Sequence, residues 1–238
     1  MRITDITEID IMDRTDLLGK IEELLVIDPA NTAVVTVEMT KRRVNERTPL
    51  PPGVLDKLVA STEELLSAAR ASGIPVIHVL SSLRDVEEKA RLNTKFQKAL
   101  RLSGQSLSPY GEVPSEYVPH QDGTFEPDLA VSVADGDFII KTKKSLSCFY
   151  QTDLEWLLRN LKRNYIVLAG MNTNADIIST AYEGSNRAMG VITVKECVAS
   201  IYGEDLHRMA LQQLGRCQGW VIDLATFKAK VRRYAEAV

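Results

Sequence analysis

Residues 165–181 read YIVLAGMNTNADIISTA, and this stretch decides how the chain folds. An apolar run from Tyr165 to Ala169 ends at Gly170, a turn rich in Asn and Thr follows, and a helical pattern then begins. Such a segment brings a turn and a helix N-terminus to the carboxyl edge of a sheet, where open α/β folds bind their ligands. Asp176 lies in this turn, so the stretch predicts a carboxylate at the functional edge of a parallel sheet.

The same alternation of strand and helix continues on both sides of this stretch. Apolar, often β-branched runs predict strands at residues 32–37, 75–80, 138–140, 165–169, 191–194 and 220–222. Helical periodicity predicts helices at residues 54–71, 153–161, 174–189 and 204–214, and a final helix after them. Repeated βα units predict an α/β fold with three α/β/α layers around a mostly parallel six-stranded sheet.

Two segments fall outside this alternation. Residues 1–30 are predicted to form an N-terminal helical arm, with Thr15 capping a helix that runs to Leu25, and residues 31–238 to form the main domain. Between the second and third strands, a charged helix is expected from Val86 to Leu102, followed by a Ser-, Pro- and Gly-rich excursion over residues 103–127. Long insertions of this kind are often lids or binding loops. The arm and the excursion are candidate subunit contacts.

The composition narrows the class of protein. The chain has 238 residues, 45% hydrophobic and 26% charged, with a net charge of −3, which does not favour a nucleic-acid partner. No apolar run approaches the roughly 20 residues that span a bilayer, and the N-terminus has no signal-peptide pattern. The three cysteines have no metal-like spacing and cannot all pair, as in reduced cytoplasmic proteins. We therefore expect a soluble cytoplasmic protein without a cofactor.

Three charged residues follow predicted strands within a turn: Glu38, Lys141 and Asp176. A parallel sheet would bring all three to one edge. A lysine between two carboxylates can keep one of them ionised and set the pKa of the other, as acid–base chemistry requires. The alternative is structural: polar residues commonly reappear where strands end, and an acidic residue in the first turn of a helix is stabilised by the helix dipole.

Several stretches together resemble one known family. The carboxyl end of the third strand is followed by Ser-x-Phe-x-x-Thr-Asp-Leu at residues 147–154 and by Gly-x-x-Thr-Asn at residues 170–174. With residues 32–39, 73–79 and 137–141, these motifs resemble the isochorismatase-like hydrolases over roughly residues 31–225. That family includes nicotinamidases, N-carbamoylsarcosine amidohydrolases, ureidoacrylate and biuret hydrolases, and isochorismatase. The resemblance also implies that the protein forms homodimers or homotetramers.

The resemblance implies a catalytic triad of aspartate, lysine and cysteine. In the amide-cleaving members the aspartate takes the proton of the thiol, the lysine polarises the pair, and the thiolate attacks the carbonyl group. Carried over to this chain, the aspartate position is Glu38, the lysine is Lys141, and the cysteine position is Asp176. A carboxylate cannot act as a soft thiolate, so Asp176 is expected to be an acid, a base that orders water, or a carboxylate nucleophile.

The function implied by the resemblance is hydrolysis of a small amide or ureido substrate without a cysteine nucleophile. Glu38 would act as base or acid, Lys141 as its electrostatic partner, and Asp176 as the group that orients or activates water. Two alternatives stay open. The first is hydrolysis of a vinyl ether, because isochorismatase itself also lacks the cysteine and cleaves such a bond. The second is an inactive relative that binds a metabolite or a protein partner, because loss of activity would also replace residues of the triad.

The substrate pocket would lie at the mouth of the helix that follows residues 165–171. Asn172 and Thr173 are expected to flank it, and Asn174 is expected to cap the helix. His120, in the long excursion, is a further candidate for contact with the substrate.

Other residues bear on whether the pocket binds a metal, contains a second nucleophile or attracts a charged substrate. Residues 41–47 contain no histidine where nicotinamidases bind zinc, so no metal is expected. Cys148 is expected to be a buried, inert thiol rather than a relocated nucleophile. Arg84, Lys89 and Arg91 could attract an anionic small-molecule substrate, although an exposed charged helix would carry the same residues.

Overall fold

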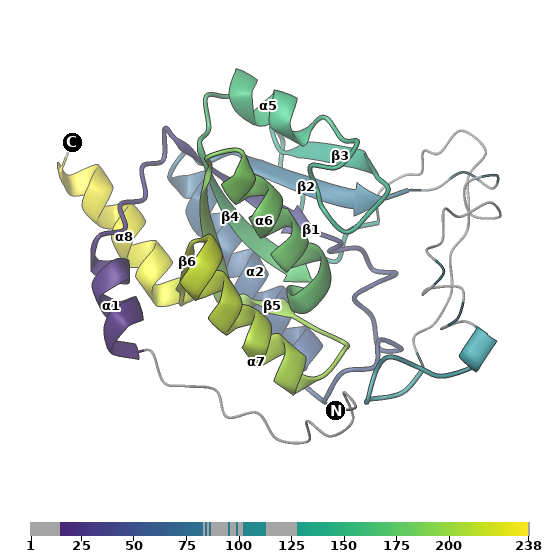
Figure 1. Ribbon diagram of the computed structural model, residues 1–238. Helices are drawn as coiled ribbons and strands as arrows, with labels where there is room; N and C mark the ends of the chain where they lie inside the picture. The colour runs from purple at the N-terminus through teal and green to yellow at the C-terminus, as the bar shows by residue number, and fades with distance from the viewer. Residues whose placement is uncertain are drawn as a thin grey trace.

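Six strands form one parallel sheet in the computed structural model (Figure 1). The structure describes residues 15–82, 84, 86, 95, 99, 102–112 and 128–237. The sheet order is β3-β2-β1-β4-β5-β6, and every pairing between neighbouring strands is parallel. The predicted fold class is therefore confirmed. The strands are β1 (Thr32–Val37), β2 (Val76–Ser81), β3 (Phe138–Lys143), β4 (Tyr165–Met171), β5 (Gly190–Ala199) and β6 (Trp220–Ile222).

Helices cover both faces of the sheet, with α2 behind it and α6 and α7 in front in Figure 1. Two π-helical turns, η2 (Thr173–Ile177) and η3 (Leu214–Gln218), adjoin these helices. The predicted helix over residues 86–102 lies almost wholly outside the described residues. The described α-helices are α1 (Thr15–Glu23), α2 (Val54–Ala71), α5 (Leu154–Asn160), α6 (Ile178–Asn186), α7 (Glu204–Gln213) and α8 (Leu224–Ala237).

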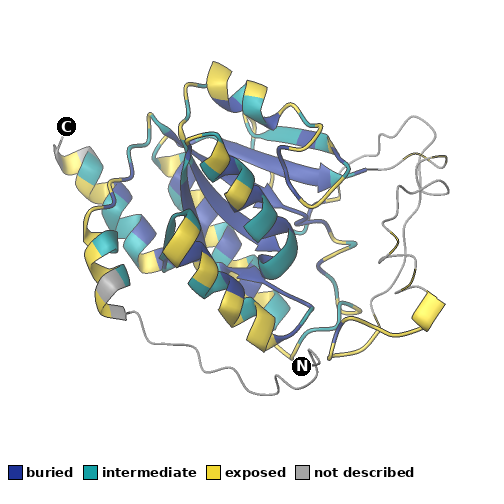
Figure 2. Ribbon diagram, in the orientation of Figure 1, coloured by how far each residue is buried: buried dark blue, intermediate teal, exposed yellow. Residues whose placement is uncertain are grey.

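The inner strands β1, β2 and β4 are buried on both faces, as the dark blue of the central sheet shows in Figure 2. Neighbouring residues along a strand point to opposite faces, so β1 contributes Val34 to one apolar core and Val35 to the other. The first core includes Leu65 of α2 and Phe227 of α8, and the second includes Leu154 of α5. Burial on both faces explains why the strands are continuous apolar runs rather than alternating ones.

A row of polar side chains runs from β1 through β2 to the residue that precedes β3. Thr36 Oγ1 is 2.7 Å from Nδ1 of His78, whose Nε2 is 3.3 Å from Oδ2 of Asp137. Arg70 at the end of α2 donates to the same Asp137 oxygen at 2.6 Å. The Thr36 and His78 side chains are fully buried, and burial lowers the pKa of His78. This row connects α2 to the start of β3. A substrate could not reach Thr36 or His78, because both side chains are fully buried.

Within the described part of the chain, no helix has the length and apolar character needed to cross a membrane. α1 contacts the edge of the sheet, where the indole N–H of Trp220 donates to the carbonyl oxygen of Ile21 at 3.0 Å. The division into an arm and a main domain, and the subunit contacts expected for the arm and the excursion, stay predictions.

Gly170 allows β4 to pass unusually close to the end of β1. Its φ is 122°, and a Cβ atom at this position would lie 2.0 Å from the carbonyl oxygen of Val37. Val37 directly precedes Glu38, and Gly170 lies one residue before the end of the strand that leads to Asp176. The missing side chain therefore sets the spacing of the two segments that carry these acidic residues.

Replacing this glycine is expected to cost more stability than replacing a glycine in open space. Gly73→Ala is the matched control, because Gly73 also has a positive φ, 71°, but nothing lies within 4 Å of its added Cβ. The free energy of unfolding of the control is expected to fall by roughly 1–2 kcal/mol, because of the left-handed conformation alone. Gly170→Ala adds a clash with the backbone, so its free energy of unfolding is expected to fall by more than about 3 kcal/mol. Urea unfolding checks both values, and equal losses would contradict the close approach.

Candidate active site

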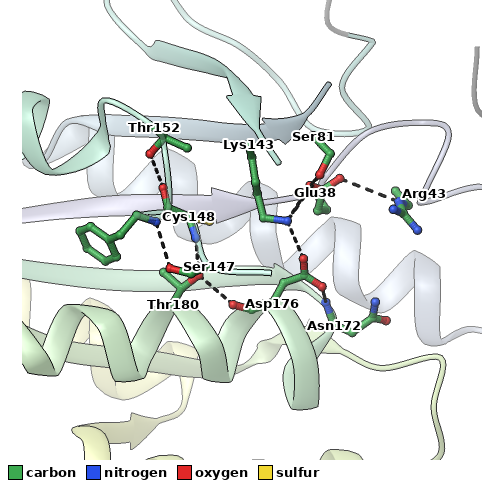
Figure 3. A network of polar contacts seen from close by, with 11 residues as sticks. Glu38, Arg43, Ser81, Lys143, Ser147, Cys148, Thr152, Asn172, Asp176 and Thr180 are labelled. Atoms are coloured by element: carbon green, nitrogen blue, oxygen red, sulfur yellow. Dashed lines mark hydrogen bonds and ion pairs between the residues drawn. The ribbon is translucent and has the colours of Figure 1, made fainter. Parts of the chain in front are cut away.

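Two acidic side chains meet at the carboxyl edge of the neighbouring strands β1 and β4 (Figure 3). Glu38 follows β1 directly and has a φ of 57°, a left-handed conformation that costs a residue with a side chain roughly 1–2 kcal/mol. Asp176 lies in η2, the turn that follows β4. Both residues are buried. Non-glycine residues in strained conformations gather at functional sites, so Glu38 marks this edge as a candidate active site.

The ammonium group of Lys143 lies between the two carboxylates. Its Nζ donates to Oε1 of Glu38 at 3.0 Å and to Oδ1 of Asp176 at 2.6 Å. The Lys143 side chain is only 2% exposed, so both contacts are shielded from water. The predicted Glu38 and Asp176 do meet, but around Lys143. The structure thus corrects the expected position of the lysine by two residues, from Lys141 to Lys143.

The reason for this correction is the length of β3. The apolar run ends at Ile140, so the sequence predicts that the strand stops before Lys141. β3 instead continues to Lys143, which pairs with Ser81 after a register shift opposite β2. The observed strand is three residues longer than predicted, and Lys143 lies two residues, roughly 6.6 Å, beyond Lys141. Because β3 is an edge strand, its last residues can be polar and still pair, and the extension carries Lys143 to the acidic pair.

Burial and the shared ammonium group separate the acid strengths of the two carboxyl groups. Burial opposes the ionisation of Glu38, but the charges of Lys143 and Arg43 lower its pKa below the ordinary value. A hydrogen bond from the Ser81 hydroxyl acts in the same direction. Burial raises the pKa of Asp176, and the charge of Glu38 adds to this effect, against the attraction of Lys143. The site therefore pairs an ionised glutamate with an aspartic acid that retains its proton more readily than usual.

Lys143 stays charged in this environment. Its burial favours the neutral amine, but the two neighbouring carboxyl groups more than offset that effect and raise its pKa. The lysine is therefore an electrostatic partner and not a base or a nucleophile.

The two oxygen atoms of Glu38 have different surroundings. Oε1 accepts hydrogen bonds from Lys143 and from the Ser81 hydroxyl. Oε2 is buried and accepts no hydrogen bond from a described residue. Nε of Arg43 lies 3.8 Å from Oε2, which makes an ion pair but is too long for a hydrogen bond. A buried carboxylate oxygen without a donor can accept a proton from water or from a substrate.

The turn that holds Asp176 is fixed by its own backbone. The Met171–Asn172 peptide bond is cis. The N–H of Asn172 donates to Oδ2 of Asp176 at 3.3 Å, and the Asn172 side-chain oxygen accepts from the N–H of Ile201 at 3.1 Å. On the helix side, the Thr180 hydroxyl donates to the carbonyl oxygen of Asp176 at 2.7 Å. Asn172 thus positions Asp176 and links its turn to the end of β5.

The next two residues of the turn contact the segment after β5. Thr173 Oγ1 is 2.8 Å from Nδ1 of His207 on α7. Oδ1 of Asn174 accepts a hydrogen bond from the Ser200 hydroxyl at 2.5 Å. The expectation that Asn174 caps the helix is therefore wrong, because Asn172 is at the N-cap position and the Asn174 side chain is used for a tertiary contact. The expected contacts of Asn172 and Thr173 with a substrate stay predictions.

Cys148 is unsuited to act as a nucleophile. The residue is fully buried, and its N–H donates to Oγ1 of Thr180 at 3.1 Å. Burial raises the pKa of its thiol to about 12, so the thiolate is scarce at neutral pH. In Figure 3 it lies on the opposite side of Lys143 from Arg43. The predicted burial of this thiol is confirmed.

Some expected site residues cannot be placed. His120, Lys89 and Arg91 lie outside the described residues. In the part of the chain that the structure describes, no three His, Cys, Asp or Glu side chains gather where they could hold a metal ion.

Sequence reasoning missed Lys143, Ser81, Arg43 and His207. Ser81 could have been found by the rule that found Glu38, because it ends the apolar run of β2. The other three depend on the length of β3, on the path of the loop after β1 and on the docking of α7, for which the sequence carries no local signal.

Comparison with known proteins identifies the family. The family model described as the isochorismatase domain matches residues 24–226. The chain belongs to the isochorismatase family. The prediction that it is an isochorismatase-like hydrolase is therefore confirmed.

Similar proteins include curated enzymes and solved structures. The chain is 26% identical over 219 residues to the ureidoacrylate amidohydrolase RutB of Methylobacterium radiotolerans, covering 87% of this chain and 82% of that one. A cysteine hydrolase from Pseudomonas syringae pv. phaseolicola superimposes with a TM-score of 0.68 at 23% identity, over 88% and 96% of the two chains. The N-carbamoylsarcosine amidase of Thermoplasma acidophilum superimposes with a TM-score of 0.57 at 22% identity, over 82% and 96%.

Removing the ammonium group is expected to destabilise the fold in a pH-dependent manner. Lys143→Met leaves two buried carboxyl groups without their cation, a loss of about 3–5 kcal/mol at neutral pH. Their folded-state pKa values would then rise above the unfolded values, so the stability of the variant should recover as the pH falls and worsen as it rises. Urea unfolding at about pH 5 and pH 8 measures this difference.

Lys141→Met is the matched control, because Lys141 lies on the same strand, is partly exposed and contacts neither carboxylate. It is expected to change stability by less than about 0.5 kcal/mol. A larger loss for Lys141→Met than for Lys143→Met would restore the original assignment of the lysine.

Proposed function

We propose that the protein hydrolyses a C–N bond in a small amide or ureido substrate, with carboxyl groups in place of a cysteine nucleophile. The single observation that supports this most strongly is the buried contact of Lys143 with both Glu38 and Asp176. It holds two carboxyl groups on one ammonium group, with the pKa of Glu38 lowered and that of Asp176 raised, which is the pairing that general acid–base hydrolysis needs. The named activities of the amidohydrolase relatives point to the same class of bond.

Glu38 is the proposed general base. Its lowered pKa keeps it ionised near neutral pH, and its Oε2 is a buried acceptor without a hydrogen-bond donor. A water molecule at this oxygen would give its proton to Glu38 as its own oxygen bonds to the substrate carbonyl carbon. Lys143 holds Oε1 and keeps the carboxylate oriented during this step.

Asp176 is the proposed general acid. Its raised pKa leaves it protonated over a wider pH range than an exposed aspartate. As the C–N bond breaks, Asp176 would donate its proton to the leaving nitrogen, and the electron pair of that bond would go to the same nitrogen. The proton taken up by Glu38 later restores Asp176 through solvent. One water molecule is consumed, and Lys143 remains charged throughout.

The developing negative charge on the carbonyl oxygen would be held at the start of η2. The first N–H groups of a helix have no acceptor within the helix, and here they belong to Thr173 and Asn174. Backbone donors placed in this way stabilise an oxyanion. The contacts of Asn172, Thr173 and Asn174 with the segment after β5 keep this backbone rigid.

Substitution of either carboxyl group is expected to abolish most of the turnover. Asp176→Asn and Glu38→Gln keep the size of the side chain and are each expected to lower kcat by roughly 10²–10⁴-fold. Cys148→Ala is the control and should retain kcat within a few-fold, because the buried thiol takes no part. A screen of amides, ureides and carbamates with the purified protein supplies the substrate. Loss of turnover in Cys148→Ala with full activity in Asp176→Asn would indicate a thiol mechanism instead.

The pH dependence of kcat/KM is expected to be bell-shaped. Activity should fall in acid as Glu38 becomes protonated, below its ordinary range because its pKa is lowered. Activity should fall again towards higher pH as Asp176 loses its proton, above the ordinary range of an aspartate because its pKa is raised. In Asp176→Asn, the alkaline limb should disappear from the residual activity. A profile that rises with pH and never falls would assign Asp176 as a base.

Vinyl-ether hydrolysis is the second candidate. A carboxyl group with a raised pKa beside a charged lysine can also protonate the carbon of an enol ether, and this reaction needs no nucleophilic side chain. Including an enol ether in the substrate screen distinguishes the two reactions. An absence of turnover on every class, with ligand-induced thermal shifts retained, would instead indicate a binding protein.

A further inference from the structure

Arg43 presents a guanidinium group at the edge of the acidic pair, where it forms an ion pair with Glu38 but no hydrogen bond to a described residue. Its Nε is 3.8 Å from Oε2 of Glu38, and its side chain is 44% exposed. Among the described residues, none accepts a hydrogen bond from this guanidinium group. A guanidinium group has five N–H donors in a rigid fork, so its capacity to bind an anion is unused. In Figure 3, Arg43 lies on the side of Glu38 away from Lys143.

The backbone of Arg43 is held at both ends of its peptide unit. Its N–H donates to the carbonyl oxygen of Thr40 at 2.9 Å, and its carbonyl oxygen accepts from the Thr48 hydroxyl at 2.8 Å. The next residue, Val44, is buried in the core and also bonds to Thr40. The loop therefore places Arg43 beside the site in advance, and a ligand need not order it on binding.

Tyr202 approaches the same region from the end of β5. Its backbone N–H donates to Ser200 Oγ at 3.1 Å, and Ser200 is bonded to Asn174 in the turn that carries Asp176. Burial and the charge of Asp176 raise the pKa of Tyr202, while the charge of Arg43 lowers it. The charges of both side chains therefore act on the phenol. Because Glu38 and Asp176 both contact Lys143, a ligand that lies beside Arg43 and Glu38 would also be close to Asp176.

We propose that Arg43 is a specificity-determining residue that binds a carboxylate on the substrate, so that the enzyme acts on amide or ureido acids and not on their neutral counterparts. The proposal rests on the proposed hydrolase function and names its substrate class. A carboxylate is planar and has two acceptor oxygens, which match the fork of a guanidinium group.

The charges of the site favour a single negative charge on the ligand. Lys143 and Arg43 carry two positive charges against the one negative charge of Glu38, and the raised pKa of Asp176 disfavours a second negative charge. A monocarboxylate on the ligand offsets the remaining positive charge, whereas a neutral substrate leaves it beside the reaction. The carboxylate would also draw Arg43 away from Glu38 and leave Oε2 free to accept the proton of water.

Matched substrates test the proposal. The probes are 3-ureidopropanoate and shorter and longer ureido acids, each compared with its uncharged primary amide. The native protein is expected to prefer the acids. Arg43→Gln is expected to lower the ratio of kcat/KM for the acids to kcat/KM for the amides by roughly 10- to 100-fold, mainly through the KM of the acids. Any loss that both classes share follows from the pKa of Glu38, which the charge of Arg43 also lowers. Equal losses for acids and amides, or a native preference for amides, would overturn the proposal.

Lys41→Gln is the control variant. Lys41 is a neighbouring exposed cation that pairs with Asp128 at 2.7 Å and does not contact the acidic pair. It should leave the preference for acids unchanged. If Lys41→Gln and Arg43→Gln reduce the activity on acids equally, the effect is due to the general surface charge, and the proposal that Arg43 binds the substrate carboxylate is wrong.

A binding measurement separates failure of this proposal from failure of the proposed function. Succinate has two carboxylates and no bond to hydrolyse, and its binding is measured by calorimetry with the native protein and with Arg43→Gln. Weaker binding by the variant supports the anchor even if no ureide is turned over. Equal binding by both proteins, or binding by neither, overturns it even if ureides are hydrolysed.

Discussion

The buried ammonium group of Lys143 fixes the arrangement of three strand ends. A carboxylate taken out of water is destabilised by several kcal/mol unless a cation compensates it. Glu38 comes from the end of β1 and Asp176 from the turn after β4, and both are compensated by a lysine at the end of β3. The close passage of Gly170 past Val37 brings the two acidic segments within reach of one side chain. Geometry and charge therefore depend on each other at this edge.

The same contact creates the chemical difference between the two acids. Glu38 has Lys143, Arg43 and the Ser81 hydroxyl on its side, and its pKa is lowered. Asp176 has the charge of Glu38 nearby and is buried, and its pKa is raised. Two carboxyl groups of similar intrinsic strength thereby have pKa values shifted in opposite directions, which is a common way for an active site to supply both an acid and a base.

Membership of the isochorismatase family accounts for the sheet, its strand order and the turn after β4. It does not account for the acid at position 176 or the glutamate at position 38. The solved relatives support the architecture, and their identities of 22–23% leave the chemistry to be argued from this chain's own residues. Those residues are Glu38, Lys143, Asp176 and Arg43. The reaction that we propose for them uses no reactive thiol.

The sequence by itself determined the parallel sheet, the position of Asp176 in a turn at its carboxyl edge, and the arrival of Glu38 at the same edge. These features are local, because an apolar run and the residue that follows it are adjacent in the chain. Only the tertiary structure decided that Lys143, and not Lys141, completes the site, since the register shift in β3 depends on its pairing with β2. The same holds for Arg43, because the path of a loop is set by the elements it packs against.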